Sequence, residues 1–338
     1  TDYGCLMVTP EFDIKRSVLV GDTADVYLQR TLTILRNEGV NPVVSIEFNS
    51  LDNGIFCGIS EVKDLLNQVL PNVGSEVWSL EESSIVNKGE VALRVKAPYG
   101  AIGMYETAIC GILASSTGWA TAANECVAEA KDIPVIAFGA RNIHPNVVMN
   151  FGYSAIKGGC VSCSTTAGSR ISGVAPSGNM THSLSLIMSS TLKAIEAFDK
   201  HMPREVPRVA LVDTFTDESV EAVFIATEMG ERLRGIRVDT PQERGGVTTD
   251  LVKEIRSRLN LEGFSHVDIM VTGGLNPERI REFVEAQAPV DSFGVGTFIA
   301  SATPKPFRAG IKEIEGVPVA KRGRIPGLTP NTRLTRLI

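Results

Sequence analysis

The sequence feature that most restricts the fold is an alternation of apolar runs with amphipathic segments, which begins near residue 132. The runs are almost continuous in apolar and small residues, as parallel strands buried on both faces are: IPVIAFGAR, CVSCSTT, VAPSGN, RVALVDTF, GIRVDT, VDIMVTGG and SFGVGT. Segments of helical periodicity separate several of them: SLIMSSTLKAIEAFDK, DESVEAVFIATEMGERL, TTDLVKEIRSRLN and NPERIREFVEAQ. Amphipathic helices between parallel strands predict either a βα barrel or a doubly wound sheet.

Polar residues gather where these predicted strands end. In a βα barrel such positions share one rim, on which active sites form, whereas a doubly wound sheet concentrates them at a switch point. The polar groups here follow five or more strands, namely Arg141, Asp213–Thr214, Arg237–Asp239, Thr272–Gly274 and Gly294–Thr297. That spread favours the barrel, and seven strand candidates predict an incomplete one, because a complete barrel has eight strands.

The chain before about residue 100 has an irregular alternation of helix and strand signals. We expect helices over residues 22–39 and 60–70, and strands around residues 41–48, 77–82 and 91–98. This pattern is typical of an α+β layer. A long, mostly apolar helical segment follows over residues 98–131. We therefore expect an open-faced α+β sandwich domain over residues 1–110, completed by residues 301–338, and a βα-barrel domain over residues 111–300. The long helical segment is expected to connect domains or to face a second subunit.

Charge and hydropathy argue against two classes of partner. Lys and Arg total 33 against 39 Asp and Glu, so the net charge is −6, whereas general nucleic-acid binding favours a strongly basic surface. No apolar run approaches the roughly 20 residues that span a bilayer, and the first residues lack the basic and apolar regions of a signal peptide. We expect no nucleic acid, no membrane and a cytoplasmic location.

The cysteines give little sign of a metal site. Six are scattered along the chain, and only Cys160 and Cys163 have C-x-x-C spacing. A structural zinc site usually takes four ligands, and no second such pair lies in the sequence. The spacing therefore favours free thiols in a reducing compartment over a zinc site.

Two glycine-rich loops follow late strands of the predicted barrel. The segment VTGGLNPERI contains Thr272, Gly273 and Gly274, and SFGVGTF, about one βα unit later, contains Gly294, Gly296 and Thr297. Glycine lets backbone N–H groups approach an anion, and a helix N-terminus adds a favourable dipole. A pair of such loops late in a barrel predicts a phosphate site, although tight turns alone explain either loop. The G-x-G-x-x-G pattern of a first Rossmann turn is absent.

Charged and aromatic residues lie at other strand ends. Asp213 and Asp239 are one βα repeat apart, so they should be neighbours on the rim. They either hold ribose hydroxyls or a hydrated Mg²⁺ bound mainly by substrate phosphates, or form a rim salt bridge, for instance with Arg237. Arg141 suits a bidentate clamp for a carboxylate or phosphate. Phe138 either stacks on a flat ligand or packs in the core.

His182 is one of four histidines and lies in the stretch SGNMTHSL. It follows a predicted strand end and precedes an apolar helix, so it should reach the same rim. An isolated histidine is more often structural than reactive. From the residues alone, both interpretations stay open.

Taken together, these residues resemble the nicotinate phosphoribosyltransferase family in its compact archaeal and bacterial form. The resemblance keeps its order over nearly the whole chain: ADVYLQRT, PYGAIGMYETAICGIL, FGAR-x-x-HP, the glycine-serine loop at 158–164, G-x-M-x-H, LVDTF, IRVDTP, VTGGL, FGVGT and VPVAKRGRIPG. It implies a sandwich domain paired with an incomplete barrel, and a homodimer or larger assembly. The implied reaction joins nicotinate to phosphoribosyl pyrophosphate, giving nicotinate mononucleotide and pyrophosphate in NAD salvage.

The resemblance also implies roles for individual residues. His182 matches a histidine that ATP phosphorylates, which makes ATP a co-substrate. Phe138 matches an aromatic side chain that stacks on the pyridine, and Tyr27 one that stacks from the neighbouring subunit, so that active sites are shared. Arg141 matches an arginine near the pyridine and pyrophosphate.

The remaining implied roles concern the phosphoribosyl part of the substrate. Arg237 and Asp239 match positions around the ribose and pyrophosphate, and the four loop glycines match the cradle for the 5′-phosphate. Thr272 and Thr297 flank that cradle. Mg²⁺ arrives with phosphoribosyl pyrophosphate rather than in a site of the protein's own, and lies near Asp213 and Asp239.

Three departures from the family pattern leave the base open. Asn142 stands where close relatives have a second arginine, and Asn179 where they have threonine. The loop KGGCVSCS lacks an acidic residue often found there, which disfavours nicotinamide, because a carboxylate can accept its amide, and leaves room for an altered base. The alternatives are a related phosphoribosyltransferase for another aromatic base, or a catalytically weak nucleotide-binding homologue.

Overall fold

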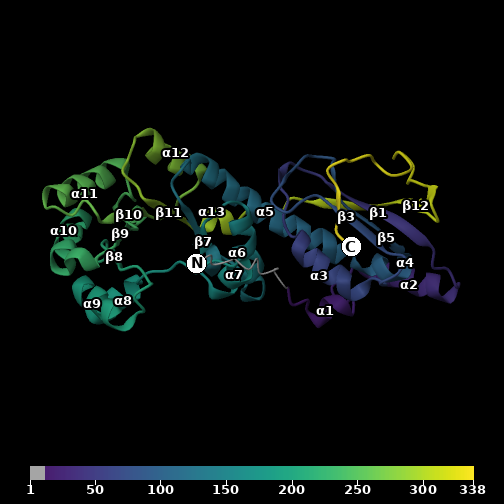
Figure 1. The fold of residues 1–338 in the computed structure, drawn as a ribbon, viewed down its shortest axis with the longest axis horizontal. Coiled ribbons are helices and arrows are strands. Elements are labelled where there is room, and N and C mark those ends of the chain that lie inside the picture. The colour runs from purple at the N-terminus through teal and green to yellow at the C-terminus, as the bar shows by residue number, and fades with distance from the viewer. Residues whose placement is uncertain (1–11) are drawn as a thin grey trace, which may run out of the picture.

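The structure is a computed structural model and describes residues 12–338. Two lobes lie side by side along the long axis of the molecule, with helix α5 (Glu106–Ala130) between them (Figure 1). Each lobe is built around its own six-stranded sheet and its own buried apolar core. Within the described residues, no helix is long and apolar enough to cross a membrane.

The first sheet is antiparallel and contains strands from both ends of the chain. Its order is β13-β12-β1-β5-β3-β14, with bounds β1 (Val43–Ser50), β3 (Glu76–Ser79), β5 (Val91–Pro98), β12 (Phe307–Ile314), β13 (Val317–Pro318) and β14 (Thr335–Arg336). The predicted strands around residues 41–48, 77–82 and 91–98 are therefore confirmed. So are the predicted helices that become α2 (Val26–Asn37) and α3 (Ile59–Val69). The short elements of this lobe are α1 (Arg16–Leu19), α4 (Tyr99–Ile102) and the β2 (Gly54–Ile55)–β4 (Ile85–Val86) pair.

The second sheet is wholly parallel and runs in the order β7-β6-β11-β10-β9-β8. Its strands are β6 (Val135–Ala137), β7 (Ser162–Cys163), β8 (Val209–Leu211), β9 (Gly235–Val238), β10 (Asp268–Val271) and β11 (Ser292–Val295). The first strand, β6, pairs with the last, β11. Among the described residues no ladder joins β7 to β8, so the hydrogen bonding of this sheet is not closed.

Helices cover the second sheet and connect its strands (Figure 1). They are α6 (Val148–Lys157), α7 (Thr166–Ser172), α8 (His182–Met188), α9 (Thr191–His201), α10 (Glu218–Met229), α11 (Thr249–Leu261), α12 (Pro277–Glu285) and α13 (Thr297–Ala300). Three of the four predicted helical segments in this half are confirmed, and the fourth, residues 185–200, is broken at Ser189 and Ser190 into the end of α8 and the helix α9. Asp217 caps α10 by accepting hydrogen bonds from the N–H groups of Ser219 and Val220, and Asn276 caps α12 through the N–H of Arg279.

One predicted strand is wrong. The segment VAPSGN, residues 174–179, forms neither strand nor helix. Pro176 has no N–H to give to a ladder, and the segment lies beside β7 through isolated bonds instead. Ser177 N–H donates to the Cys163 carbonyl at 3.0 Å, and the Ser162 hydroxyl donates to the Ala175 carbonyl at 2.7 Å. The parallel sheet therefore has six strands and not seven.

A half-buried carboxylate connects the lobes. Glu82 accepts hydrogen bonds from the backbone N–H groups of Gly58 at 2.6 Å and Ser60 at 3.0 Å, at the start of α3. The hydroxyl of Tyr153, on α6, donates to the same carboxylate at 3.2 Å. The predicted domain boundary at residues 110 and 111 falls inside the continuous helix α5, and where the chain divides stays a prediction.

Candidate active site

The carboxyl ends of the parallel strands surround a cavity of about 700 Å³. Ten of the residues predicted from the sequence line it, drawn from the ends of β6, β9, β10 and β11: Phe138, Arg141, Arg237, Asp239, Thr272, Gly273, Gly274, Gly294, Gly296 and Thr297. The parallel order explains this meeting, because all carboxyl ends of a parallel sheet lie at one edge. His182, Asp213 and Tyr27 are not in this lining.

Arg237 lies at the centre of the polar contacts. Its Nη2 donates to Oδ2 of Asp239 at 2.6 Å, and its Nε donates to the hydroxyl of Thr272 at 2.9 Å. Arg237 and Asp239 are two residues apart on one strand and therefore share a face. The rim salt bridge that the sequence left open is present, and the arginine still lines the cavity.

The aromatic wall of the cavity depends on a glycine. The Arg237 guanidinium carbon lies 5.5 Å from the centroid of the Phe138 ring, a cation–π contact. A Cβ at Gly294 would come within 2.6 Å of Cγ2 of Thr272 and within 2.8 Å of the Phe138 ring. The absent side chain thus makes room for the ring, which joins the cavity wall rather than the closed core.

The two glycine loops differ in backbone conformation. Gly273 and Gly274 have φ values of 92° and 64°, a left-handed region that favours glycine. Gly296 has no such requirement, and a Cβ there would meet its nearest neighbour at 3.6 Å. In the second loop, Nδ2 of Asn142 donates to the hydroxyl oxygen of Thr297 at 3.1 Å. Backbone groups of both loops therefore border the cavity, as a phosphate cradle requires.

His182 is joined to Asp213 beside the cavity. Its Nε2 lies 3.0 Å from Oδ2 of the aspartate. The imidazole is 41% exposed, whereas the aspartate side chain is only 2% exposed. His182 begins helix α8, where the hydroxyl of Thr181 caps the helix by accepting from the Leu184 N–H. A buried carboxylate thus fixes the orientation of an accessible imidazole.

Asp213 is electrostatically coupled to its surroundings. Burial raises the pKa of its carboxyl, the hydrogen bond and charge of His182 lower that pKa, and the charge of Asp239 raises it. The charge of Asp239 thus reaches Asp213, while the expected adjacency of the two aspartates on the rim stays a prediction. Oδ1 of Asp213 is buried without a hydrogen-bond partner. Within residues 12–338 no cluster of three His, Cys, Asp or Glu side chains could hold a metal on its own.

The last predicted site residues lie apart from these contacts. Arg141 is exposed at the cavity lining, in a short 3₁₀ turn (Gly139–Asn142). Tyr27 is 61% exposed on α2 in the other lobe, where its hydroxyl donates to Asp25 at 3.0 Å. The Asp25 hydrogen bond raises the pKa of Tyr27. Cys160 and Cys163 are buried free thiols and lie in the core behind the sheet.

Sequence reasoning missed four residues of the lining: Leu275, Asn276, Phe298 and Ser301. Asn276 carries a recognisable signal, Asn-Pro before a helix, but that signal describes a cap rather than a site. The others have no pattern of their own and reach the cavity because they follow the two glycine loops.

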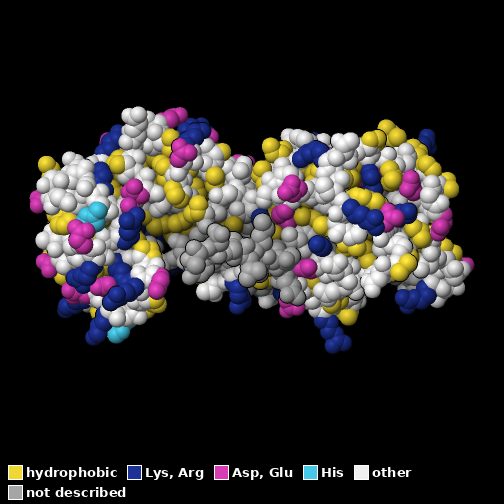
Figure 2. Space-filling model, in the orientation of Figure 1, with side chains coloured by type: hydrophobic (Ala, Val, Ile, Leu, Met, Phe, Trp, Pro, Cys, Tyr) yellow, Lys and Arg dark blue, Asp and Glu magenta, His cyan; other side chains and the backbone are white. Residues whose placement is uncertain are grey.

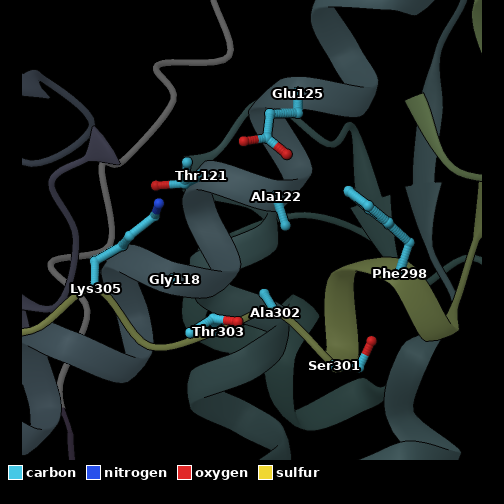
Figure 3. Close-up of a pocket in the computed structure, with 9 residues that line it drawn as sticks. All are labelled: Gly118, Thr121, Ala122, Glu125, Phe298, Ser301, Ala302, Thr303 and Lys305. Carbon is cyan, nitrogen blue, oxygen red and sulfur yellow. The ribbon is translucent and has the colours of Figure 1, made fainter. Parts of the chain in front are cut away.

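A smaller cavity of about 280 Å³ adjoins the first (Figure 3). Phe298 and Ser301 of the α13 region line both cavities. In the close-up, Lys305 extends toward Thr121 of α5, and its amine pairs with Asp52 at 3.0 Å. The lysine of this cavity is therefore already engaged, and the cavity contains none of the predicted site residues.

On the face in Figure 2, acidic and basic side chains are interspersed over the described residues.

Comparison with known proteins places the chain by sequence. Residues 25–117 match the family model "Quinolinate phosphoribosyl transferase, N-terminal domain", and residues 119–308 match the corresponding C-terminal domain. A nicotinate phosphoribosyltransferase of Mycobacterium tuberculosis is 29% identical over 269 residues, which cover 78% of this chain and 56% of that protein. The chain thus spans about half the length of the curated relatives it matches.

Solved structures give the same placement. The crystal structure titled nicotinate-nucleotide pyrophosphorylase from Pyrococcus furiosus has a TM-score of 0.85 and 37% sequence identity, and the match covers 94% of this chain and 81% of that one. Human nicotinic acid phosphoribosyltransferase has a TM-score of 0.71 at 16% identity, over 90% of this chain and 77% of that one. At 16% identity, the similarity to the human protein shows only that the two chains share a fold.

Proposed function

This chain belongs to the quinolinate and nicotinate phosphoribosyltransferase family, and from that premise we propose that it forms nicotinate mononucleotide and pyrophosphate from nicotinate and phosphoribosyl pyrophosphate. The observation that carries the proposal is the position of Arg237. It lies over the Phe138 ring and bonds to Asp239 and Thr272, in a cavity bordered by both glycine loops. A flat base, a ribose and a phosphate can therefore be bound side by side.

Each part of the cavity suits one part of the substrates. The Phe138 ring offers a flat surface for the pyridine. Arg141 and Arg237 neutralise the pyrophosphate, and Asp239 accepts from ribose hydroxyls. The backbone of the Gly273–Gly274 and Gly294–Gly296 loops binds the 5′-phosphate.

The chemistry needs orientation and charge more than a base. The bond between ribosyl C1 and pyrophosphate breaks through a cation-like transition state, so the arginines stabilise the charge that develops on the departing pyrophosphate. Holding the ring nitrogen in line with C1 supplies much of the acceleration. The attacking pyridine nitrogen has no proton to lose, so no general base is required.

Asp213 and Asp239 suit a hydrated Mg²⁺ that is carried by phosphoribosyl pyrophosphate. Oδ1 of Asp213 is a buried acceptor without a partner, and both residues are hard oxygen donors. When bound, the cation supplies neutralisation of the pyrophosphate charge. The carboxylates orient its bound waters by accepting their hydrogen bonds.

ATP would act through His182. Because Nε2 is engaged by Asp213, Nδ1 is the ring nitrogen left to accept a phosphoryl group. The carboxylate fixes the tautomer and stabilises the positive charge that the ring gains. The partly exposed imidazole can be reached from solvent, as phosphorylation requires.

The parallel sheet is interpreted here as an open barrel whose seam lies between β7 and β8. The pairing of first strand with last supports this, because it arises when a sheet curls round on itself. The lobe that carries the antiparallel sheet forms the sandwich domain, with the C-terminal strands as part of it. Both interpretations, the open barrel and the sandwich domain, are more specific than the family placement. Both rest on the strand orders of the two sheets.

A homodimer with shared active sites would give Tyr27 its role. Helix α2 exposes three apolar side chains, with Val26 at 54%, Tyr27 at 61% and Ile34 at 60% exposure. Exposed apolar side chains grouped on one helix favour burial against another surface. In such a dimer the Tyr27 ring faces the Phe138 ring of the partner across the base.

Purified protein with phosphoribosyl pyrophosphate, Mg²⁺ and a panel of bases tests the proposal. The panel contains nicotinate, quinolinate and pyridines with other substituents, with and without ATP. Product from nicotinate supports the proposed reaction. Product from another base alone would assign the chain to a sister enzyme, and ligand binding without turnover to a nucleotide-binding homologue.

A further inference from the structure

Neither the oxygen nor the nitrogen of the Asn179 side-chain amide has an oxygen or nitrogen atom as a hydrogen-bond partner. Its Oδ1 is buried without a hydrogen bond. Its Nδ2 reaches only the thioether sulfur of Met270, at 4.0 Å. Asn179 lies in the irregular segment 173–181 that follows α7, yet it touches β10, 91 residues further along the chain. The side chain therefore reaches from this segment to a strand of the parallel sheet.

The position of Met270 places this amide near the candidate active site. Met270 pairs in register with Arg237 on the neighbouring strand, so the two side chains share a face. Met270 is also two residues before Thr272 on that face. Arg237 and Thr272 both line the cavity. The amide of Asn179 thus contacts a side chain adjacent to these two lining residues, while neither Asn179 nor Met270 lines the cavity itself.

An unpartnered amide in such a place is costly. A buried donor or acceptor without a hydrogen bond loses the solvation it had in the unfolded chain and gains nothing in return, and a thioether is only a weak acceptor. Threonine, which the resemblance expects at this position, would bury a smaller polar group. The cost is offset if a bound ligand supplies both a donor and an acceptor to the amide.

The substituent of the base can be matched to this requirement. A ring stacked on Phe138 can direct one substituent toward Met270. A carboxylate there accepts from Nδ2 but has no hydrogen to give to Oδ1. A carboxamide satisfies both ends, because its carbonyl accepts from Nδ2 and its NH₂ donates to Oδ1.

We infer that Asn179 is a specificity-determining residue that admits a pyridine bearing a carboxamide, in addition to the carboxylate-bearing base; this rests on the proposed function. The loop at 158–164 lacks the acidic residue that could accept the amide hydrogens of nicotinamide, and Asn179 supplies an acceptor from the nearby segment 173–181. The chain is thus a phosphoribosyltransferase for both nicotinate and nicotinamide.

The test compares kcat/KM for nicotinate and nicotinamide in the wild type, Asn179→Leu and Asn179→Asp. Leucine keeps the shape without hydrogen bonds, and aspartate offers an acceptor that also repels a carboxylate. A matched control is Asn67→Leu, an exposed asparagine on α3 in the other lobe. The ratio of the two values is decisive, because a folding defect lowers both equally.

We expect the wild type to use both bases. In Asn179→Leu the value for nicotinamide should fall at least about ten-fold further than that for nicotinate, as expected for one lost hydrogen bond of about 1.4 kcal/mol. Asn179→Asp should lose nicotinate selectively. The inference is overturned if the wild type neither converts nor binds nicotinamide, or if the ratio is the same in all variants.

Loss of the proposed function alone gives a different result. If the wild type converts neither base, calorimetric titration of both bases replaces turnover. Nicotinamide binding that Asn179→Leu loses selectively then supports the inference, although the proposed reaction has failed. Equal binding of nicotinamide by both proteins overturns the inference.

Discussion

Nε2 of His182 lies 3.0 Å from Oδ2 of Asp213, although the two residues are 31 positions apart and come from different elements. The buried carboxylate of Asp213 holds the accessible imidazole of His182 in one orientation. A histidine that is merely packed in a core would not be held toward solvent, so the pair supports the proposed reactive role of His182, which stays a prediction. The arrangement favours a reactive ring.

Asp213→Asn should weaken phosphorylation of His182 by ATP. The amide keeps the shape of the carboxylate but cannot stabilise a charged imidazole, so we expect at least about ten-fold slower labelling. The rate of labelling is measured with radioactive ATP, by counting the protein-bound phosphate that acid releases. His182→Ala should carry no label. Equal labelling of wild type and His182→Ala contradicts the phosphohistidine, and equal labelling of wild type and Asp213→Asn contradicts the role of the carboxylate.

Arg237→Lys should impair the enzyme almost as strongly as Arg237→Ala. A lysine ammonium cannot hold Asp239, Thr272 and the Phe138 ring together, because it lacks the planar fork. We expect kcat/KM for phosphoribosyl pyrophosphate to fall by about 100-fold or more, roughly 3 kcal/mol. Steady-state kinetics at saturating base measure this, and Arg234→Lys, which is largely exposed, is the control. Full activity of Arg237→Lys would rule out the central role.

Gly294→Ala should displace the aromatic wall. The new methyl group would lie 2.6 Å from Thr272 and 2.8 Å from the Phe138 ring, and overpacking of this kind costs about 1–3 kcal/mol. The KM for the base should rise at least about ten-fold. Gly111→Ala is the control, because no atom lies within 4 Å of its Cβ position on α5. A variant at Gly294 with unchanged KM would show that the ring does not contact the base.

Glu61 should make stability depend on pH. Burial, with the nearby charges of Asp64 and Glu82, raises its pKa from 4.5 to about 7, against the opposing hydrogen bond from Asn150. The folded state therefore binds a proton more tightly than the unfolded chain, and stability falls as pH rises from about 4.5 to about 7. The loss is at most about 3 kcal/mol.

Glu61→Gln should flatten this dependence, because the neutral amide still accepts from Asn150 without titrating. Thermal unfolding midpoints at pH 5 and pH 8 measure the dependence. The midpoint of the variant should exceed that of the wild type only at pH 8. Glu205→Gln, which is exposed, serves as the control and should leave the dependence unchanged. A wild type equally stable at both values would contradict the raised pKa.

The sequence predicted the parts of the fold that follow from local pattern. Continuous apolar runs identified six parallel strands, and the residues after them identified most of the cavity lining. The strand prediction for residues 174–179 was wrong. The apolar residues there suggested a strand, but Pro176 has no N–H to donate to a neighbouring strand. No local pattern indicates that Asn179 reaches Met270, or that His182 pairs with Asp213, because both contacts depend on how distant segments meet.

Formation of nicotinate mononucleotide tests the account most directly. Purified protein is incubated with phosphoribosyl pyrophosphate, Mg²⁺ and nicotinate, and product is followed by chromatography with release of pyrophosphate. The account predicts one pyrophosphate for each nicotinate mononucleotide, with the rate lowered about 100-fold or more in Arg237→Ala and retained in Gly111→Ala. Absence of nicotinate mononucleotide from a folded wild type that binds phosphoribosyl pyrophosphate would contradict it.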